Sequence, residues 1–243
     1  MYIKRLAIVL WVCLAGQSHC LYAQKANLQM WGDHEFHFPF ANTYSFQTET
    51  SYRTLLSDEQ KWRSLQFHPQ LSANILTFAD LLLSVPVIYT AQTDTVNTSE
   101  IRVMVGTRLF LNSVKRVHTQ VMVRFERRHQ KHIGEGDWST GNRLRVRGDL
   151  IIPINQNSYY EDKQWYSLMK IEAFFVEDDV DERFANRLRL SLGAGYRLNY
   201  NLRFEAEYNA QSSRNQISEE FSSNDHIIRF RIMHYINKAR ISE

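Results

Sequence analysis

The sequence has only two cysteines, Cys13 and Cys20, and both lie within its first 23 residues. Those residues have the layout of a secretory signal peptide, so we expect them to be removed on export. The mature chain then has no thiol. This absence excludes a disulfide framework, a cysteine-ligated metal and a cysteine nucleophile, whatever the compartment.

The leader is predicted from the basic pair Lys4 and Arg5, an apolar run at 6–16, and a polar stretch that ends at Ala23, after which we expect cleavage. The apolar run has about half of the ~20 residues that a membrane-spanning helix needs, which argues against a permanent anchor. Acylation of Cys20 would make a lipoprotein. The residues before it, Gln-Ser-His, lack the small and aliphatic side chains expected there.

The mature chain also lacks long apolar runs, linkers and a strong charge of one sign. No stretch after residue 23 suits a membrane helix, and no segment rich in proline, glycine or serine divides residues 44–236, so we expect one domain. The formal net charge of +3 falls to about +1 because the leader takes two cations and no acid with it. A near-neutral chain does not favour nucleic acid as a partner.

Apolar side chains do recur at every second position, which is the period of a β-strand. In residues 101–111, one face carries Ile101, Val103, Val105, Thr107, Leu109 and Leu111, and the other carries Arg102, Met104, Gly106, Arg108 and Phe110. The same alternation occurs at 117–126, 143–152 and 187–198, and less cleanly at 43–54, 63–78, 80–91, 164–177, 201–212 and 225–236. We therefore expect about ten strands, each with the ~9–11 residues or more that a tilted membrane strand requires.

The polar face of these strands is densely charged. It carries Arg102, Arg108, Arg124, Glu126, Arg145, Arg147, Asp149, Glu172, Arg189, Arg203, Glu205, Glu207, Arg229 and Arg231. Strands of soluble sandwiches run ~5–6 residues, about half the length seen here. The pattern predicts an all-β, antiparallel up-and-down transmembrane barrel with an Arg/Glu-rich lumen. A soluble barrel with charges outside is the alternative, because alternation does not distinguish inside from outside.

The connections and the aromatic residues fit the membrane form. Short links at 79, 112–113 and 199–201 interleave with long polar ones at 92–99, 129–141, 178–185 and 213–224, while 154–163 is long where a short turn is expected. Aromatic residues near strand ends suit the interfacial girdles: Trp62, Tyr89, Trp165, Tyr166, Tyr196 and Tyr200.

Counting from residue 43, the barrel spans 43–236 with an even number of strands, ten, and leaves a polar tail at 237–243. Residues 24–42 do not fit that count. They form an eleventh strand, half of an extra hairpin that would bring the total to twelve, or a stretch packed at the periplasmic mouth.

Several motifs resemble the DUF2490 family of Bacteroidetes outer-membrane proteins. They are Trp31, the Glu-x-x-x-Arg strand at 49–53, Glu-Ile-Arg at 100–102, Arg-Phe-Glu-Arg-Arg at 124–128, Asn-Arg-Leu-Arg at 142–145, the run at 186–198 and Arg-Phe-Glu-Ala-Glu-Tyr at 203–208. The resemblance covers nearly all of the mature chain. It implies an outer-membrane β-barrel and brings no known activity. The last strand departs from such barrels, which often end on an aromatic residue, because Tyr235 is followed by Ile236 and the polar tail.

No catalytic residue, metal site or cofactor is assigned. Histidines and serines near strand ends form neither a His-x-Ser-Asn nor a Gly-x-Ser-x-Gly motif: His118, Ser139, Ser212, Ser213, His226 and His234. His129 and His132 have a helical metal spacing but lie in a basic stretch, and the acidic segment 177–182 lacks EF-hand spacing.

We therefore expect an exported, non-enzymatic barrel of the cell outer membrane, with a structural role, a narrow passive pore, or the binding of a small ligand that the sequence does not identify. Its partners would be outer-membrane lipid and the barrel-assembly machinery. A lipid-modifying membrane enzyme and a soluble periplasmic barrel that binds an apolar ligand are the alternatives.

The lumen charges have two arrangements. Either they interlock as a plug, with Arg145, Arg147, Arg189 and Arg203 against Glu126, Glu172, Glu205 and Glu207, or the excess guanidinium groups line a wet anion-selective channel.

Overall fold

The computed structural model describes residues 27–40, 43–56, 62–92, 97–111, 116–176, 187–214 and 221–236. Its regular elements are β1 (Asn27–Pro39), β2 (Tyr44–Leu55), β3 (Trp62–Leu76), β4 (Ala79–Ser84), β5 (Val87–Gln92), β6 (Thr98–Phe110), β7 (His118–His132), β8 (Glu135–Pro153), β9 (Gln164–Val176), β10 (Arg187–Arg197), β11 (Leu202–Arg214) and β12 (Phe221–Tyr235). The predicted all-β fold is confirmed. The expected leader at 1–23, the acidic segment 177–182 and the tail 237–243 lie outside the described residues.

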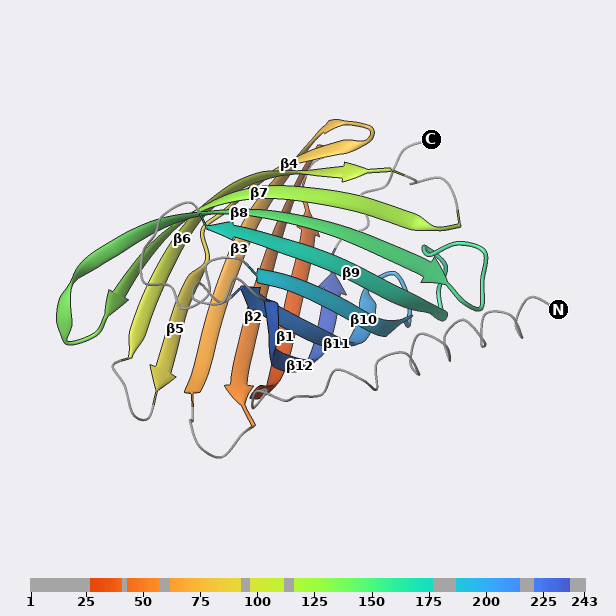
Figure 1. Cartoon of the computed structure of the whole chain (residues 1–243). Helices are drawn as coiled ribbons and strands as arrows, with labels where there is room; N and C mark the ends of the chain where they lie inside the picture. The colour runs from red at the N-terminus through yellow and green to blue at the C-terminus, as the bar shows by residue number, and fades with distance from the viewer. Residues whose placement is uncertain are drawn as a thin grey trace.

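The strands form one sheet that closes on itself (Figure 1). The order is β2–β1–β12–β11–β10–β9–β8–β7–β6–β4–β3, and β3 pairs again with β2, which gives a closed ring of eleven strands. The twelfth strand, β5, continues β4 end to end, because both pair with β3 on one side and with β6 on the other. Closure leaves no long unpaired edge within this ring.

A proline explains why β4 and β5 are separate. Pro86 lies between them, and it has no amide hydrogen to donate to the ladder. Flanking bonds keep the two pieces in line: the Val85 amide donates to the Pro69 carbonyl at 3.3 Å, and the Arg102 amide donates to the Pro86 carbonyl at 3.0 Å. The single strand expected at 80–91 is therefore two collinear segments.

β1 closes the ring with a parallel pairing. It pairs antiparallel with β2 but parallel with β12, from Asn27 opposite Asp225 to His37 opposite Tyr235. A ring with an even number of strands would close antiparallel, so the expected even parity is wrong, although the ring is close to the expected size. Bacterial single-chain membrane barrels have even counts, while an odd-stranded mitochondrial barrel exists. We call the end where β1 begins the N-end, and the end where β12 finishes the C-end.

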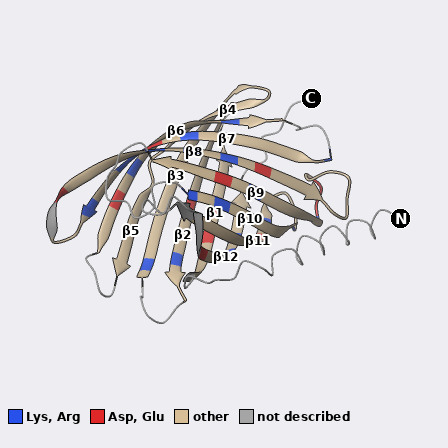
Figure 2. Ribbon diagram, viewed as in Figure 1, with Lys and Arg blue, Asp and Glu red and all other residues tan. Residues whose placement is uncertain are grey.

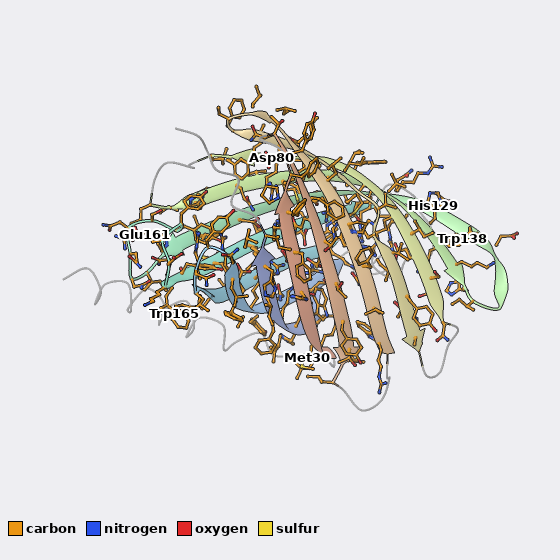
Figure 3. All side chains as sticks on the ribbon, turned by 180° about the vertical axis from the view of Figure 1, so that it is seen from behind. Met30, Asp80, His129, Trp138, Glu161 and Trp165 are labelled. Carbon is orange, nitrogen blue, oxygen red and sulfur yellow. The ribbon has the colours of Figure 1, made fainter. Side chains whose placement is uncertain are left out.

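Residues 129–141 form a hairpin and not the expected external loop. β7 runs to His132 and β8 begins at Glu135, so only Ile133 and Gly134 connect them. Gly134 has a φ of 95°, a conformation that glycine adopts without steric cost. The hairpin lies at the N-end, where Figure 3 labels His129 and Trp138, while Glu161 and Trp165 lie at the opposite end. β6 pairs with β7 as far as Thr98 opposite His132, whereas the described part of β9 pairs with β8 only as far as Val176 opposite Arg143. The polar composition that suggested a loop belongs to the paired strands β7 and β8.

The two faces of the wall differ sharply in polarity. Apolar side chains point outward: Leu190 is 51%, Leu192 56% and Phe230 52% exposed. Charged ones point inward, and Glu126 is 0% exposed. Figure 2 shows cations and anions interleaved across neighbouring strands, and the buried ones lie on the inner face, whereas Arg63 and Arg127 are exposed. The interior is therefore a polar core and the exterior is an apolar band, as the strand pattern predicted.

The assignment of Tyr166 to the interfacial aromatics is wrong. Trp165 points outward, is 51% exposed and packs against Tyr196 with ring centroids 4.6 Å apart. Tyr166 is 0% exposed and lies inside the ring. Successive residues of a strand point to opposite faces, so these two neighbours cannot belong to the same outer girdle.

Candidate functional site

The centre of the lumen is organised around Glu126 on β7. Its carboxylate accepts bonds from Arg124 Nε at 3.1 Å, Arg145 Nη1 at 2.9 Å and Arg143 Nη2 at 2.5 Å. The second carboxylate of the cluster, Glu172 on β9, accepts from Arg145 Nη2 at 2.5 Å. Because Arg145 bridges the two carboxylates, the ion pairs form a continuous chain across three strands.

A second cluster crosses the seam between β1 and β12. Arg229 donates to Asp33, and Arg231 Nε lies 2.9 Å from Glu35 Oε1. Arg231 Nη1 also donates to Glu205 Oε2 on β11 at 3.2 Å. Both strands of the parallel pair are thus joined by buried charges, which must be paired to be tolerated away from water.

Smaller charge pairs occupy the rest of the wall. Arg102 Nε and Arg128 Nε share Glu100 Oε1 at 2.7 and 2.6 Å. The others are Arg108 with Asp80 at 2.9 Å, Arg147 with Asp149 at 2.9 Å, Lys170 with Glu207 at 2.7 Å and Arg189 with Glu172 at 3.1 Å.

The connection 154–163 folds over the C-end and places Tyr159 inside the ring. Arg203 Nη1 donates to the Tyr159 hydroxyl at 2.6 Å, and the Tyr159 and Tyr166 rings meet edge to face with centroids 4.9 Å apart. Burial, the largest influence, raises the pKa of the Tyr159 phenol above its ordinary value, so the hydroxyl stays protonated. Tyr166 in turn donates to Glu205 at 2.8 Å. This connection is long because it supplies a lumen side chain.

Gly195 makes room for the Tyr166 ring. A Cβ at position 195 would lie 2.1 Å from Tyr166 Cζ. We therefore expect Gly195→Ala to lower the free energy of unfolding by about 1–3 kcal/mol through overpacking. Gly32→Ala on β1 is the control, because nothing lies within 4 Å of a Cβ there. Urea unfolding of both variants tests this, and equal midpoints would show that Tyr166 does not need the space.

Two cavities remain between these side chains. The larger, about 370 Å³, is lined by residues of the C-end such as Tyr159, Tyr160 and His118. The smaller, about 180 Å³, is lined by ten arginines, two glutamates, Trp31 and other residues. Both cavities share the wall residues Glu49, His68, Arg124, Arg147 and Arg231. Among the described side chains, these two spaces adjoin and differ in the charge of their lining.

Comparison with known proteins was made against family models and curated sequences. The model of DUF2490, a protein family of unknown function, matches residues 28–222, which runs from the start of β1 into β12. The chain belongs to the DUF2490 family. Comparison with curated proteins finds no match.

The fourteen charged residues that the sequence analysis placed on the polar face of the strands all lie on the inner face of this DUF2490 barrel. Two of them have other partners than the plug arrangement expects. Arg147 pairs with Asp149 on its own strand, and Arg203 bonds to Tyr159 in place of a glutamate. The partners that sequence reasoning missed are Asp33, Glu35, Glu49, Asp80, Glu100, Arg128 and Lys170. Most lie at inward positions of strands whose alternation is weak, and strand parity alone would have indicated them.

The described part of the DUF2490 chain offers no group of three or more potential metal ligands among histidine, cysteine, aspartate and glutamate. His129 and His132 both lie in β7, where residues three apart point to opposite faces. Among the described residues, no helix is long and apolar enough to cross a membrane.

Proposed function

We propose that this DUF2490 chain is an outer-membrane β-barrel whose lumen is closed by its own charged side chains, and that its role in the envelope is non-enzymatic. The proposal rests on the sidedness of the wall. Large apolar side chains cover the outside, including Leu190, Leu192 and Phe230, at exposed fractions above 50%. Soluble proteins rarely expose continuous apolar areas beyond a few hundred Å².

This sidedness favours the membrane form over the soluble periplasmic barrel, which would bury its apolar face. The resemblance to Bacteroidetes outer-membrane proteins supports the same location. Outer-membrane lipid would cover the band, and the barrel-assembly machinery would insert the chain after export. Fractionation of expressing cells tests the location: we expect the protein in the membrane pellet, released by detergent but not by high salt. Recovery in the soluble fraction would contradict the proposal.

The non-enzymatic role is tested separately against the lipid-modifying alternative. Detergent-solubilised barrel incubated with labelled phospholipid is expected to leave the lipid intact. Product formation that a single Ser→Ala change abolishes would overturn this part of the proposal without affecting the location.

We expect the purified barrel to give no steady conductance in planar bilayers. The ion pairs around Glu126 and Glu172 join β7, β8, β9 and β10 along the inner wall, and Tyr159 fills part of the C-end, so we expect the lumen to leave no continuous wide path. Protease protection in vesicles verifies insertion, and a porin of known conductance serves as the positive control. A large cation-selective pore would contradict both the closed lumen and its positive lining.

A further inference from the structure

The smaller cavity, which we call the arginine chamber, has an unusual balance of charge. Ten arginines and two glutamates line its 180 Å³. Both glutamates are already engaged: Glu172 accepts bonds from Arg145 and Arg189, and Glu49 Oε2 lies 3.5 Å from Arg229 Nη2. Eight of the ten arginines form an ion pair with a carboxylate, in several cases one outside the lining, whereas Arg53 has no carboxylate within 4.0 Å among the described residues.

Three guanidinium groups gather around one indole in the chamber wall. Arg53 Cζ lies 3.9 Å from the centroid of the Trp31 ring, and Arg189 and Arg229 follow at 5.0 and 5.8 Å. The face of an indole attracts cations but does not cancel their charge. Arg189 already pairs with Glu172, and Arg229 pairs with Asp33, so Arg53 is the one of the three cations that lacks a carboxylate partner among the described residues.

Arg53 is the group with unused donors. Its Nε donates to Ser51 Oγ at 3.1 Å, and among the described residues its terminal nitrogens have no hydrogen-bond partner and no carboxylate within 4.0 Å. A second polar group without a partner lies in the same wall. The Nε2 atom of His68 is buried and has no hydrogen-bond partner in the described part of the chain. Two independent polar groups are thus left without partners around one small space.

We propose that the arginine chamber binds a small oxyanion of the phosphate class. Guanidinium groups match the oxygen pairs of phosphate in a planar, two-bond geometry, and buried arginines prefer such ligands. Arg53 supplies the unoccupied fork, while Arg189 and Arg229 supply the surrounding positive potential. The anion enters from solution through the larger cavity, which adjoins the chamber at His68, and it does not come from a lipid headgroup because the chamber lies inside the wall.

Isothermal titration calorimetry of the barrel in a phosphate-free, non-ionic detergent tests this inference, with inorganic phosphate titrated against chloride at matched ionic strength. The wild type is expected to bind phosphate saturably at one site. Arg53→Gln is expected to weaken that binding at least tenfold. Arg63→Gln is the matched control, because Arg63 lies at nearly the same height on the neighbouring strand but points outward, and its affinity should stay within twofold of the wild type.

Heat-modifiable migration on gels reports whether each variant is folded. If Arg53→Gln does not fold, Arg53→Lys replaces it, since lysine keeps the charge but loses the two-bond fork, and phosphate should still bind more weakly than to the wild type. An absence of saturable binding to the wild type would overturn the inference, as would equal weakening by the variants at 53 and 63. These outcomes are distinct from failure of the proposed function, which fractionation and conductance report.

Discussion

Replacing Glu126 with glutamine is expected to lower the free energy of unfolding by roughly 3–5 kcal/mol, the cost of breaking a buried ion pair by removing one partner. Glu126 is 0% exposed and accepts bonds from three arginines. Arg145 keeps Glu172 in the variant, but Arg124 and Arg143 lose the carboxylate that neutralises them. A glutamine amide occupies the same space and cannot balance their charge.

Urea unfolding of the barrel refolded in lipid vesicles, followed by tryptophan fluorescence, measures this loss. Asp162→Asn is the control, because the Asp162 side chain is 62% exposed and lies 3.9 Å from Arg197 Nε. The Asp162 carboxylate is largely in water and far from the guanidinium, so although the Arg197 side chain is only 3% exposed, we expect this loss to stay at about 0–1 kcal/mol. Similar small losses for both variants would mean that water reaches Glu126 and that the lumen is not closed at this level.

Leu190→Arg is expected to cost roughly 2–4 kcal/mol in a bilayer, the penalty for a cation on the lipid face at mid-membrane depth. Leu190 lies in the middle of β10 and points outward, as do Val103 and Phe204. Because hydrocarbon offers no partner for a guanidinium, the new side chain must reach for the headgroups or stay unsolvated.

Gln120→Arg is the comparison for the opposite face. Gln120 points inward, lines the larger cavity, and donates to Asp149 Oδ2 at 2.5 Å. An arginine there gains a carboxylate partner and has space, so we expect a much smaller loss. Unfolding midpoints in vesicles of defined composition decide the matter, and equal losses at 190 and 120 would contradict the assigned faces.

Most strands can be predicted from the sequence because apolar and polar side chains alternate along each of them. Alternation at 101–111 and 187–198 identified β6 and β10 to within a few residues, since one wall face is apolar along its whole length. The sequence does not decide whether the segment that forms β1 is a strand of the barrel, and the reason is physical. Its segment alternates weakly before Pro39, and its closing partner is β12, about two hundred residues away along the chain, so no local pattern reports the pairing.

Some contacts of the candidate site could likewise be predicted from the sequence, and others could not. Ion pairs between adjacent strands, such as Arg145 with Glu172, follow from parity and register, because both side chains point inward at neighbouring positions. The partner of Arg203 does not follow from them. Tyr159 reaches Arg203 from the connection 154–163, which has no periodic pattern in its sequence. The space for the Tyr166 ring depends on Gly195, the third residue from the end of β10, and the sequence does not show that these two residues meet.

The parallel seam sets the order in which the wall can be completed. Among the described strands, β1 is made first and β12 last, so one edge of β1 has no partner strand until β12 has been made. A chain that stops before β12 has two free edges, each a template on which another chain can add a strand. Such a fragment also leaves Asp33 and Glu35 without the arginines that pair with them. Truncations near the C-terminus should therefore yield aggregates and not smaller barrels.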